Sequence, residues 1–461
     1  MRISRREFLI RSGCGLGTAA AVAAGIDRFG MVNALAQGSG YKALVCVFLA
    51  GGNDGNNMII PADTTGYAAY SSVRNTAGLA IAQGSLLPIV PKSIGMTFGL
   101  HPSLAAIHPL FDAGTLAVVA NVGPLVEPIT REKYLSGAPK PYQLFSHLDQ
   151  VTQWQTSVST GGSPTGWGGR VADTFGPDAA LPRVTTLASG AFGRGLITSP
   201  LSVAPAPTPL NQLLLLNGFG TTAAELMRKN AMDYLRTIDR GSALISAAQD
   251  ATGKALSLAQ QLNVDPVVAT VFPNTTLGNQ LRQVAKLIRF NQTSAAPLSR
   301  QIFFVSLGGF DTHQGQVASQ ANLLTQVGQA MKAFYDSTVE MNLASNVTTF
   351  TLSDFGRTFQ PAGSGGIVGS DHAWGNHHFV MGGSVFGGDF YGVKGKNETV
   401  FPTLQLGGPD DTDTRGRWIP TASVDQYAAT LARWFDVNAS DINTIFPQLS
   451  HFSPSHLAFL P

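Results

Sequence analysis

Short apolar runs that close on glycine or aspartate limit what this chain can fold into more than any other feature of its sequence. Residues Lys42–Leu49 (KALVCVFL) form one such run, which is bounded by Gly51-Gly52. Three further runs of the same character cover residues 115–122, 301–307 and 347–352. Continuous apolar runs with β-branched residues are typical of strands that are covered on both faces. We therefore expect these four segments to be strands of a mostly parallel sheet.

Helical spacing fills much of the chain between and after these runs. Residues 316–342 carry apolar side chains on one face, so that strand, helix and strand form a βαβ unit. Long, lightly charged segments at 221–262 and 277–290 have helical spacing between turn-rich flanks, which predicts a helical insertion at about 205–295. Residues 424–435 predict one more amphipathic helix, packed on the sheet. The mature chain, 37–461, is expected to be a single α/β domain.

The N-terminus has the order of a Tat signal peptide. Arg5-Arg6 is followed by apolar residues, by a stretch rich in glycine and alanine, and by Ala34-Leu35-Ala36. We expect residues 1–36 to be the signal and cleavage to precede Gln37. An amphipathic membrane anchor is the alternative, because it would also pair arginines with an apolar run. The signal predicts a periplasmic or secreted protein that meets the Tat translocase during export.

The net charge of the mature chain argues against two classes of partner. Removing residues 1–36 takes away five arginines and two acidic residues, so the formal charge falls from +2 to −1. A near-neutral chain without a basic patch argues against nucleic acid or an anionic membrane as a partner. No later apolar run is long enough to span a bilayer, so no stable membrane insertion is expected. Cys46 would be the remaining cysteine, predicted to be buried and inert.

Aspartates follow three of the four predicted strands. Asp54, Asp311 and Asp354 each lie within a few residues of a strand end, and His313 comes two residues after Asp311. A histidine-rich loop is expected at 369–378. Ligands collect at the carboxyl edge of parallel sheets, and mixed carboxylate and imidazole donors suit Zn²⁺ or Mn²⁺, so a two-metal site is predicted. Taken singly, these residues could instead form a turn, a helix cap or an internal ion pair.

Seven motifs, in this order, resemble the DUF1501 family of Tat-exported bacterial proteins over nearly the whole mature chain. They are GGNDGNNMIIP, the step LHP at 100–102, FSHLDQVTQW, GWGGR, GGFDTHQGQ, SDFGR and GSDHAWGNHH. That family is grouped by fold with the alkaline phosphatase and sulfatase superfamily. The resemblance implies a three-layer α/β/α sandwich, two divalent ions (Zn, Mn or Mg) and hydrolysis of phosphate, sulfate or related esters.

The resemblance also implies roles for individual residues. The metal ligands would be Asp54, Asp311, His313, Asp354 and either His372 or His378. Ser146 would be the nucleophile, although a serine before a helix is also a common cap. Arg357 would hold the non-bridging oxygens of the substrate.

The chain departs from the superfamily pattern in two places. One residue separates Asp311 from His313, where the superfamily commonly has three, and Phe355 stands where a histidine commonly follows the second aspartate. No Cys-x-Pro-x-Arg or Ser-x-Pro-x-Arg element is present, which argues against a sulfatase in the strict sense. We therefore expect a metal-dependent ester hydrolase. The alternative is a non-catalytic exported binding protein that keeps the hydrolase fold.

Overall fold

The computed structural model describes residues 40–176, 183–188, 194–199, 221–238, 241–261, 264–364 and 367–461. The expected signal peptide and its cleavage point lie outside these ranges, as does the first part of the expected insertion.

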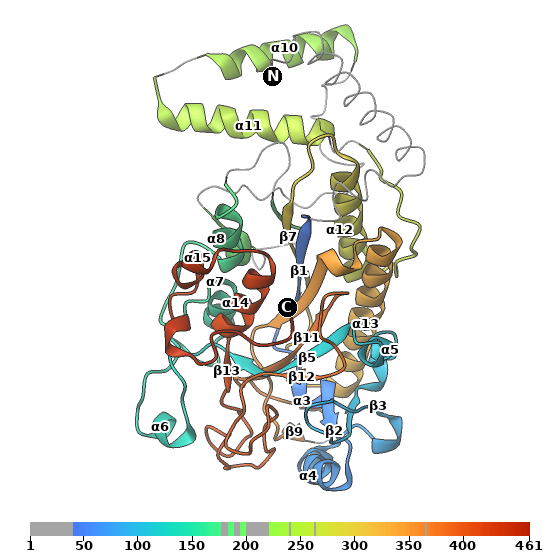
Figure 1. The fold of residues 1–461 in the computed structure, drawn as a ribbon, viewed down its shortest axis with the longest axis vertical. Coiled ribbons are helices and arrows are strands. Elements are labelled where there is room, and N and C mark those ends of the chain that lie inside the picture. Colours follow the sequence, from blue (N-terminus) through green and yellow to red (C-terminus); the bar gives the residue numbers. More distant parts are fainter. Residues whose placement is uncertain are drawn as a thin grey trace, which may run out of the picture.

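A central eight-stranded sheet organises the described residues (Figure 1). Its strand order is β12-β5-β11-β8-β1-β7-β6, with β13 paired to β5. The four strands expected from the sequence are present with ends shifted by at most one residue. The strands are β1 (Lys42–Leu49), β5 (Leu116–Gly123), β6 (Val184–Thr186), β7 (Arg300–Leu307), β8 (Val347–Ser353), β11 (Asn376–Met381), β12 (Phe390–Tyr391) and β13 (Ala422–Ser423).

The sheet is mostly parallel, as expected, and β11 is the exception. Strand β1 pairs in parallel with β7 and β8, and β6 pairs in parallel with β7. Strand β11 lies between β5 and β8 and is antiparallel to both. The expectation of a histidine-rich loop through residue 378 is wrong at its end. His377 and His378 belong to β11, whose six residues are all buried.

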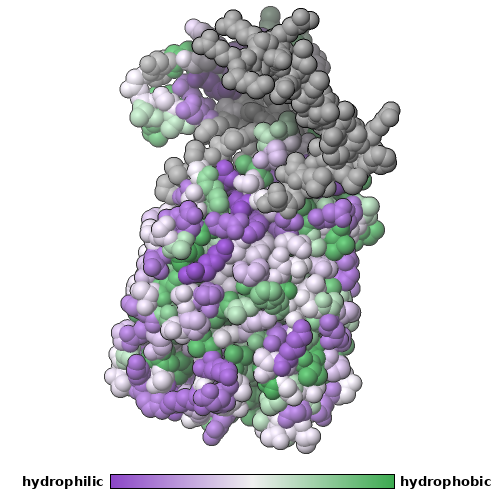
Figure 2. All heavy atoms as spheres, in the orientation of Figure 1, coloured by the Kyte–Doolittle hydropathy of each residue, from purple (hydrophilic) through white to green (hydrophobic). Residues whose placement is uncertain are grey.

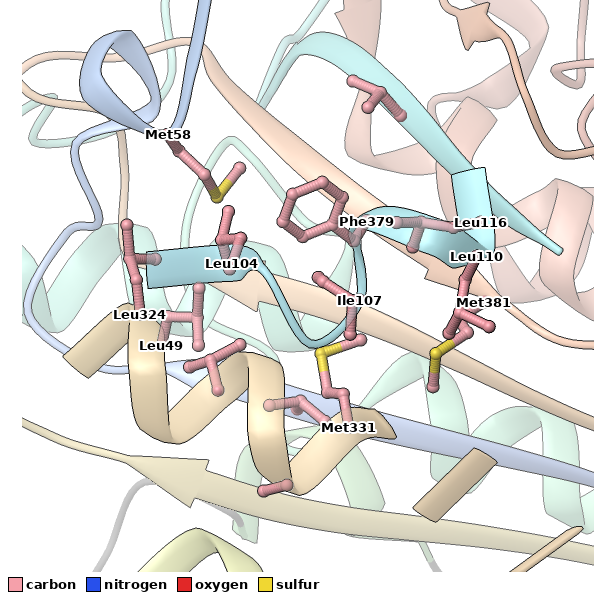
Figure 3. Close-up of a cluster of buried hydrophobic side chains, with 14 of the residues drawn as sticks. Leu49, Met58, Leu104, Ile107, Leu110, Leu116, Leu324, Met331, Phe379 and Met381 are labelled. Carbon is pink, nitrogen blue, oxygen red and sulfur yellow. The ribbon is translucent and has the colours of Figure 1, made fainter. Parts of the chain in front are cut away.

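Two apolar layers cover the sheet because side chains alternate between its faces. On β1, Ala43, Val45 and Val47 join one buried cluster, and Leu44, Cys46 and Phe48 join the other. Cys46 is fully buried, as expected, and burial raises the pKa of its thiol. Figure 3 shows part of the first cluster, where Leu324 and Met331 approach Leu49 and Ile107.

Helices form the outer layers, so the domain is an α/β/α sandwich. The first cluster contains residues of α12 (Thr276–Thr293), α13 (Gln316–Glu340) and α5 (His108–Asp112). The second contains residues of α7 (His147–Thr156), α8 (Trp167–Asp173), α9 (Arg194–Ile197), α14 (Val424–Trp434) and α15 (Ala439–Ile445). The smaller elements are α3 (Gly55–Met58), α4 (Thr64–Arg74), α6 (Arg131–Leu135), the sheet β2 (Ile59–Pro61), β3 (Leu87–Ile89) and β4 (Phe98–Leu100), and the hairpin β9 (Ala362–Ser364) and β10 (Ile367–Gly369).

The expected helical insertion divides into two parts. Helix α12 belongs to the sandwich, because its Leu281 and Ile288 are fully buried and it packs on α13. Helices α10 (Ala223–Thr237) and α11 (Ala243–Gln261) instead pair with each other at one end of the molecule (Figure 1). On the face seen in Figure 2, hydrophobic and hydrophilic residues of the main body are interspersed. None of the helices in the described ranges has both the length and the apolar character needed to cross a bilayer.

Candidate metal centre

The carboxyl ends of β1, β7 and β8 lie at one edge of the sheet, since the three strands are adjacent and parallel. The segments that follow them carry Asp54, Asp311 and Asp354. The loop before β11 brings His372 to the same edge, and His147 enters from the first turn of α7.

Three side chains from distant segments converge here: His147, Asp311 and His372. The Nε2 atoms of the two imidazoles are 3.0 Å apart, and each lies 3.5 Å from Asp311 Oδ1. His313 adjoins the group, because its Nε2 is 3.0 Å from His372 Nε2 and 3.1 Å from Asp311 Oδ1. The structure thus brings together three of the predicted ligands, Asp311, His313 and His372, and adds His147.

The other nitrogen of each imidazole faces an oxygen. His147 Nδ1 lies 2.7 Å from Asp354 Oδ2, His313 Nδ1 lies 3.1 Å from Asp371 Oδ1, and His372 Nδ1 lies 2.8 Å from the Phe145 carbonyl. Carboxylate and carbonyl oxygens are acceptors, so each Nδ1 carries the proton and donates it. In the neutral imidazoles, the three Nε2 atoms therefore present lone pairs.

This arrangement fits a divalent cation. Unprotonated nitrogens that face one another at 3.0 Å, beside a carboxylate oxygen, repel unless a positive charge lies among them. Imidazoles whose second nitrogen donates to an oxygen are the usual form of histidine ligands to metals. Burial lowers the pKa of His372, the bond to Phe145 opposes this, and neighbouring positive charge lowers it further. The lowered pKa keeps His372 in the form that binds a cation.

Arg357 does not occupy the position of a substrate clamp, which corrects the role expected from the resemblance. Its side chain is fully buried and donates to the carbonyls of Gly51, Gly52, Phe310 and Ser370. It also donates to Asp311. Partial burial raises the pKa of Asp311, but this hydrogen bond and the charge of Arg357 outweigh it and hold the pKa below its usual value. Arg357 thus fixes the strand ends and Asp311, rather than facing solvent.

Gly51 permits a close approach between the segment that follows β1 and the segment that follows β7. Its φ is +116°, and a Cβ there would lie 2.4 Å from the backbone nitrogen of Asp311. Any other residue would be strained and would push Asp311 away. The glycines at this strand end therefore help to position the carboxylate of the cluster.

Asp54 is held in a buried ion pair, so the structure does not bring it into the cluster. Both of its oxygens accept hydrogen bonds from Arg74, whose side chain is also fully buried, and further bonds come from Asn56 and Gln316. Donors therefore surround the carboxylate that the resemblance assigns to a metal. This is a correction to that expectation, and its physical cause is the cation of Arg74.

Asp354 acts on the cluster through His147. Its Oδ1 accepts the Gly51 N–H at 2.8 Å, and its Oδ2 accepts from His147. Asp371 plays the same part for His313 and is itself bonded to Arg415. Partial burial raises the pKa of Asp371, but Arg415 and His313 outweigh it and hold the pKa low. Both carboxylates orient imidazoles rather than joining the convergent group.

His378 lies in the core, away from the cluster. It is fully buried, with its ring 4.8 Å from that of Trp154 and 5.8 Å from that of Tyr427. Burial lowers its pKa to about 3, the positive charge of His377 lowers it as well, and a bond to Thr351 opposes them. Of the two expected histidines, His372 therefore lies at the cluster and His378 does not, because β11 directs His378 into the second apolar layer.

Ser146 lies between two residues that touch the cluster. Phe145 bonds to His372, and His147 is part of the group. The Ser146 hydroxyl donates to Asp149 Oδ2 at 2.6 Å, within the first turn of α7. Its role as a nucleophile stays a prediction.

Phe355 packs its ring against two imidazoles of the cluster. It is fully buried, and its ring centroid lies 4.7 Å from that of His147 and 4.6 Å from that of His372. The residue that departs from the superfamily pattern therefore supports two of the imidazoles by contact.

Two residues of this region, His147 in the cluster and Arg74 beside Asp54, were not singled out by the sequence analysis. His147 is directly next to Ser146 in the motif FSHLDQVTQW, so the motif itself was a usable signal. Arg74 lies in α4 without any nearby motif, and its pairing with Asp54 is a contact that only the folded chain reveals.

Comparison with known proteins supports the family resemblance. The model of the family described as "Protein of unknown function (DUF1501)" matches residues 295–399. No curated protein matches the chain.

Among solved structures, the chain is similar to the PsFucS1 sulfatase from Pseudoalteromonas sp., with 10% identity and a TM-score of 0.30 over 77% of this chain. It spans 65% of that protein, just under two thirds of its length. It is also similar to the phosphonate monoester hydrolase of Agrobacterium radiobacter (10% identity, TM-score 0.28, 86% of this chain and 74% of that one). A third is the alkaline phosphatase from the Antarctic bacterium TAB5 (8% identity, TM-score 0.26, 74% and 92%).

Proposed function

We propose that this chain is an exported hydrolase that depends on one divalent cation and cleaves a phosphate, sulfate or related ester. The observation that carries the proposal is the convergence of His147, Asp311 and His372, with His313 beside them. These side chains would hold the cation. A bound divalent cation supplies Lewis acidity, which neutralises negative charge that develops on an ester during hydrolysis.

The exposure of the cluster favours catalysis over a purely structural ion. The side chain of Asp311 is 49% exposed and that of His313 is 43% exposed, while those of His147 and His372 are 32% and 25% exposed. Structural zinc sites are usually closed by four protein ligands, whereas catalytic sites keep a position open. A substrate can therefore reach this group from solvent.

A single cation suits the donors better than the pair implied by the resemblance. Within the described ranges, one group of metal-binding side chains converges. Asp54 is neutralised by Arg74, and Asp354 is engaged with His147 and Gly51. Phe355 occupies the place of a further imidazole.

Two arginines beside the cluster supply positive charge that an anionic ester would meet. Arg415 bonds to Asp371 and is 34% exposed, while Arg417 donates to the His372 carbonyl and is 22% exposed. Guanidinium groups recognise phosphate and sulfate oxygens well. We assign to these residues the substrate contact that the buried Arg357 cannot make.

The rival is an exported binding protein that holds the cation without catalysis. The Ser146–Asp149 hydrogen bond favours it, because the predicted nucleophile already has an acceptor in its own helix. The two functions differ in turnover, not in metal content.

The test compares the purified chain with His372→Ala and with the control His456→Ala, which changes an exposed histidine elsewhere. Elemental analysis should find about one equivalent of Zn or Mn in the wild type and the control, and much less in His372→Ala. The same samples are assayed with p-nitrophenyl phosphate, bis(p-nitrophenyl) phosphate and p-nitrophenyl sulfate. Chelation should abolish turnover, and added metal should restore it. A bound ion without turnover of any ester supports the rival, and a wild type without metal overturns the proposed site.

A further inference from the structure

A groove of about 410 Å³ lies in a part of the chain that neither motif nor metal cluster uses. Three segments line it: the start of α6 and the residues before it, the loop after β12, and the segment that leads into β13. Its volume falls in the range of small-molecule sites.

Unpaired positive charge lies at this groove. Lys133 and Lys394 line it and are exposed. In the described part of the chain, neither ammonium group has an ion pair or hydrogen bond as donor. Lys396 also lines the groove, but it is paired with Glu132 at 2.7 Å. Two free cations therefore remain for an anionic group of a ligand.

A buried carboxylate faces the same groove. Asp410 is 7% exposed, and its Oδ2 accepts the Thr403 N–H at 2.9 Å. Its Oδ1 accepts no hydrogen bond from the described residues. Gly395 lies beside this oxygen, since a Cβ at that position would be 3.6 Å from Asp410 Oδ1. An accessible carboxylate oxygen at the groove wall can accept a hydrogen bond from a hydroxyl or similar group of a ligand.

The remaining walls are apolar. Ile129 and Ile419 line the groove together with three prolines, and they can cover the carbon skeleton of a ligand. Both isoleucines belong to a small buried cluster that contains Trp374, two residues after His372. The groove is thus rigidly supported by packed side chains.

We propose that this groove binds a sugar unit that carries an anionic substituent, a carboxylate, sulfate or phosphate. The anionic substituent pairs with Lys133 and Lys394, a sugar hydroxyl donates to Asp410 Oδ1, and the C–H face of the ring contacts the isoleucines and prolines. This proposal does not rest on the hydrolase function, because none of these residues belongs to the metal cluster.

Binding is measured by isothermal titration calorimetry on the metal-free full chain, so that failure of the metal site leaves the test intact. The probes are glucuronate, glucose 6-sulfate and glucose 6-phosphate, with glucose and inorganic sulfate as controls. At least one acidic sugar should bind. Each control should bind at least about tenfold more weakly, since glucose lacks the anionic substituent and inorganic sulfate lacks the sugar ring. The three acidic probes distinguish the substituents.

The double variant Lys133→Ala/Lys394→Ala should weaken binding about tenfold, because two exposed ion pairs are lost. The matched control Lys229→Ala/Lys332→Ala removes the same charge from α10 and α13 and should leave the affinity unchanged, as should His372→Ala. Absence of binding by every acidic sugar overturns the proposal. So does an equal loss in the control double variant, or loss of binding in His372→Ala.

Discussion

His147 Nδ1 lies 2.7 Å from Asp354 Oδ2, and this contact fixes which nitrogen of His147 faces the cluster. The same carboxylate accepts the backbone N–H of Gly51, so one aspartate ties the end of β1 to an imidazole of α7. Orientation of a ligand by a second residue contributes to metal affinity without adding a donor atom.

Asp354→Asn tests that orientation. The amide keeps the size of the side chain but loses the charge that stabilises the Nδ1 proton, so the affinity for Zn²⁺ should fall about 10- to 100-fold. Competition with a chromogenic chelator measures it. Asp371→Asn should have a smaller effect, because His313 is more exposed than His147. Unchanged affinity in Asp354→Asn would show that the contact does not support the site.

Asp54→Asn distinguishes a structural ion pair from a metal ligand. The substitution leaves the buried Arg74 without its counter-charge, which should lower the free energy of unfolding by about 3–5 kcal/mol. Urea denaturation measures this loss. Elemental analysis of the folded fraction should still find the metal. Loss of metal with little loss of stability would instead restore Asp54 as a ligand.

Gly51→Ala links backbone conformation to the site. A residue with a Cβ at φ +116° should cost about 1–3 kcal/mol in strain, and its Cβ would also collide with the backbone of Asp311. Both stability and metal affinity should fall. Gly78→Ala is the matched control, with φ +74° and open space around its Cβ position. It should lose stability alone, and equal metal affinities in the two variants would contradict the proposed coupling.

The free energy of unfolding at acid pH should depend on the buried His378 of β11. Burial holds the pKa of His378 at about 3 in the folded chain, while the unfolded chain has the ordinary value of 6.5. Between these values the unfolded state binds the extra proton, so stability is complete above pH 6.5 and falls as the pH drops toward 3. His378→Phe should reduce the slope of unfolding free energy against pH by about 1.4 kcal/mol per unit in this window. Chemical denaturation in chelator at several pH values measures it, and parallel slopes for the two proteins would refute the assignment.

Sequence patterns predicted the buried parallel strands well, because both faces of such strands must be apolar. They failed at β11, whose sequence NHHFVM contains two histidines. A neutral imidazole can be buried among aromatic rings, as His378 is beside Trp154, and this cannot be told from a ligand by residue type alone. The sequence placed Asp311, His313 and His372 near one another, as the structure has them, but did not predict the pairing of Asp54 with Arg74. That pairing depends on where α4 packs, which no local pattern encodes.

The pairing of β5 with strands from the C-terminal part of the chain limits when the sheet can be assembled during synthesis. In the described part of the chain, every strand that pairs with β5 comes much later in the sequence: β11, β12 and β13. The segment 116–123 therefore leaves the ribosome long before its partner strands are synthesised. Until then, the backbone N–H and C=O groups of β5 lack their partners in the sheet. Such non-local pairing slows folding and exposes the nascent chain to aggregation. The central sheet is completed only when the last quarter of the polypeptide has emerged.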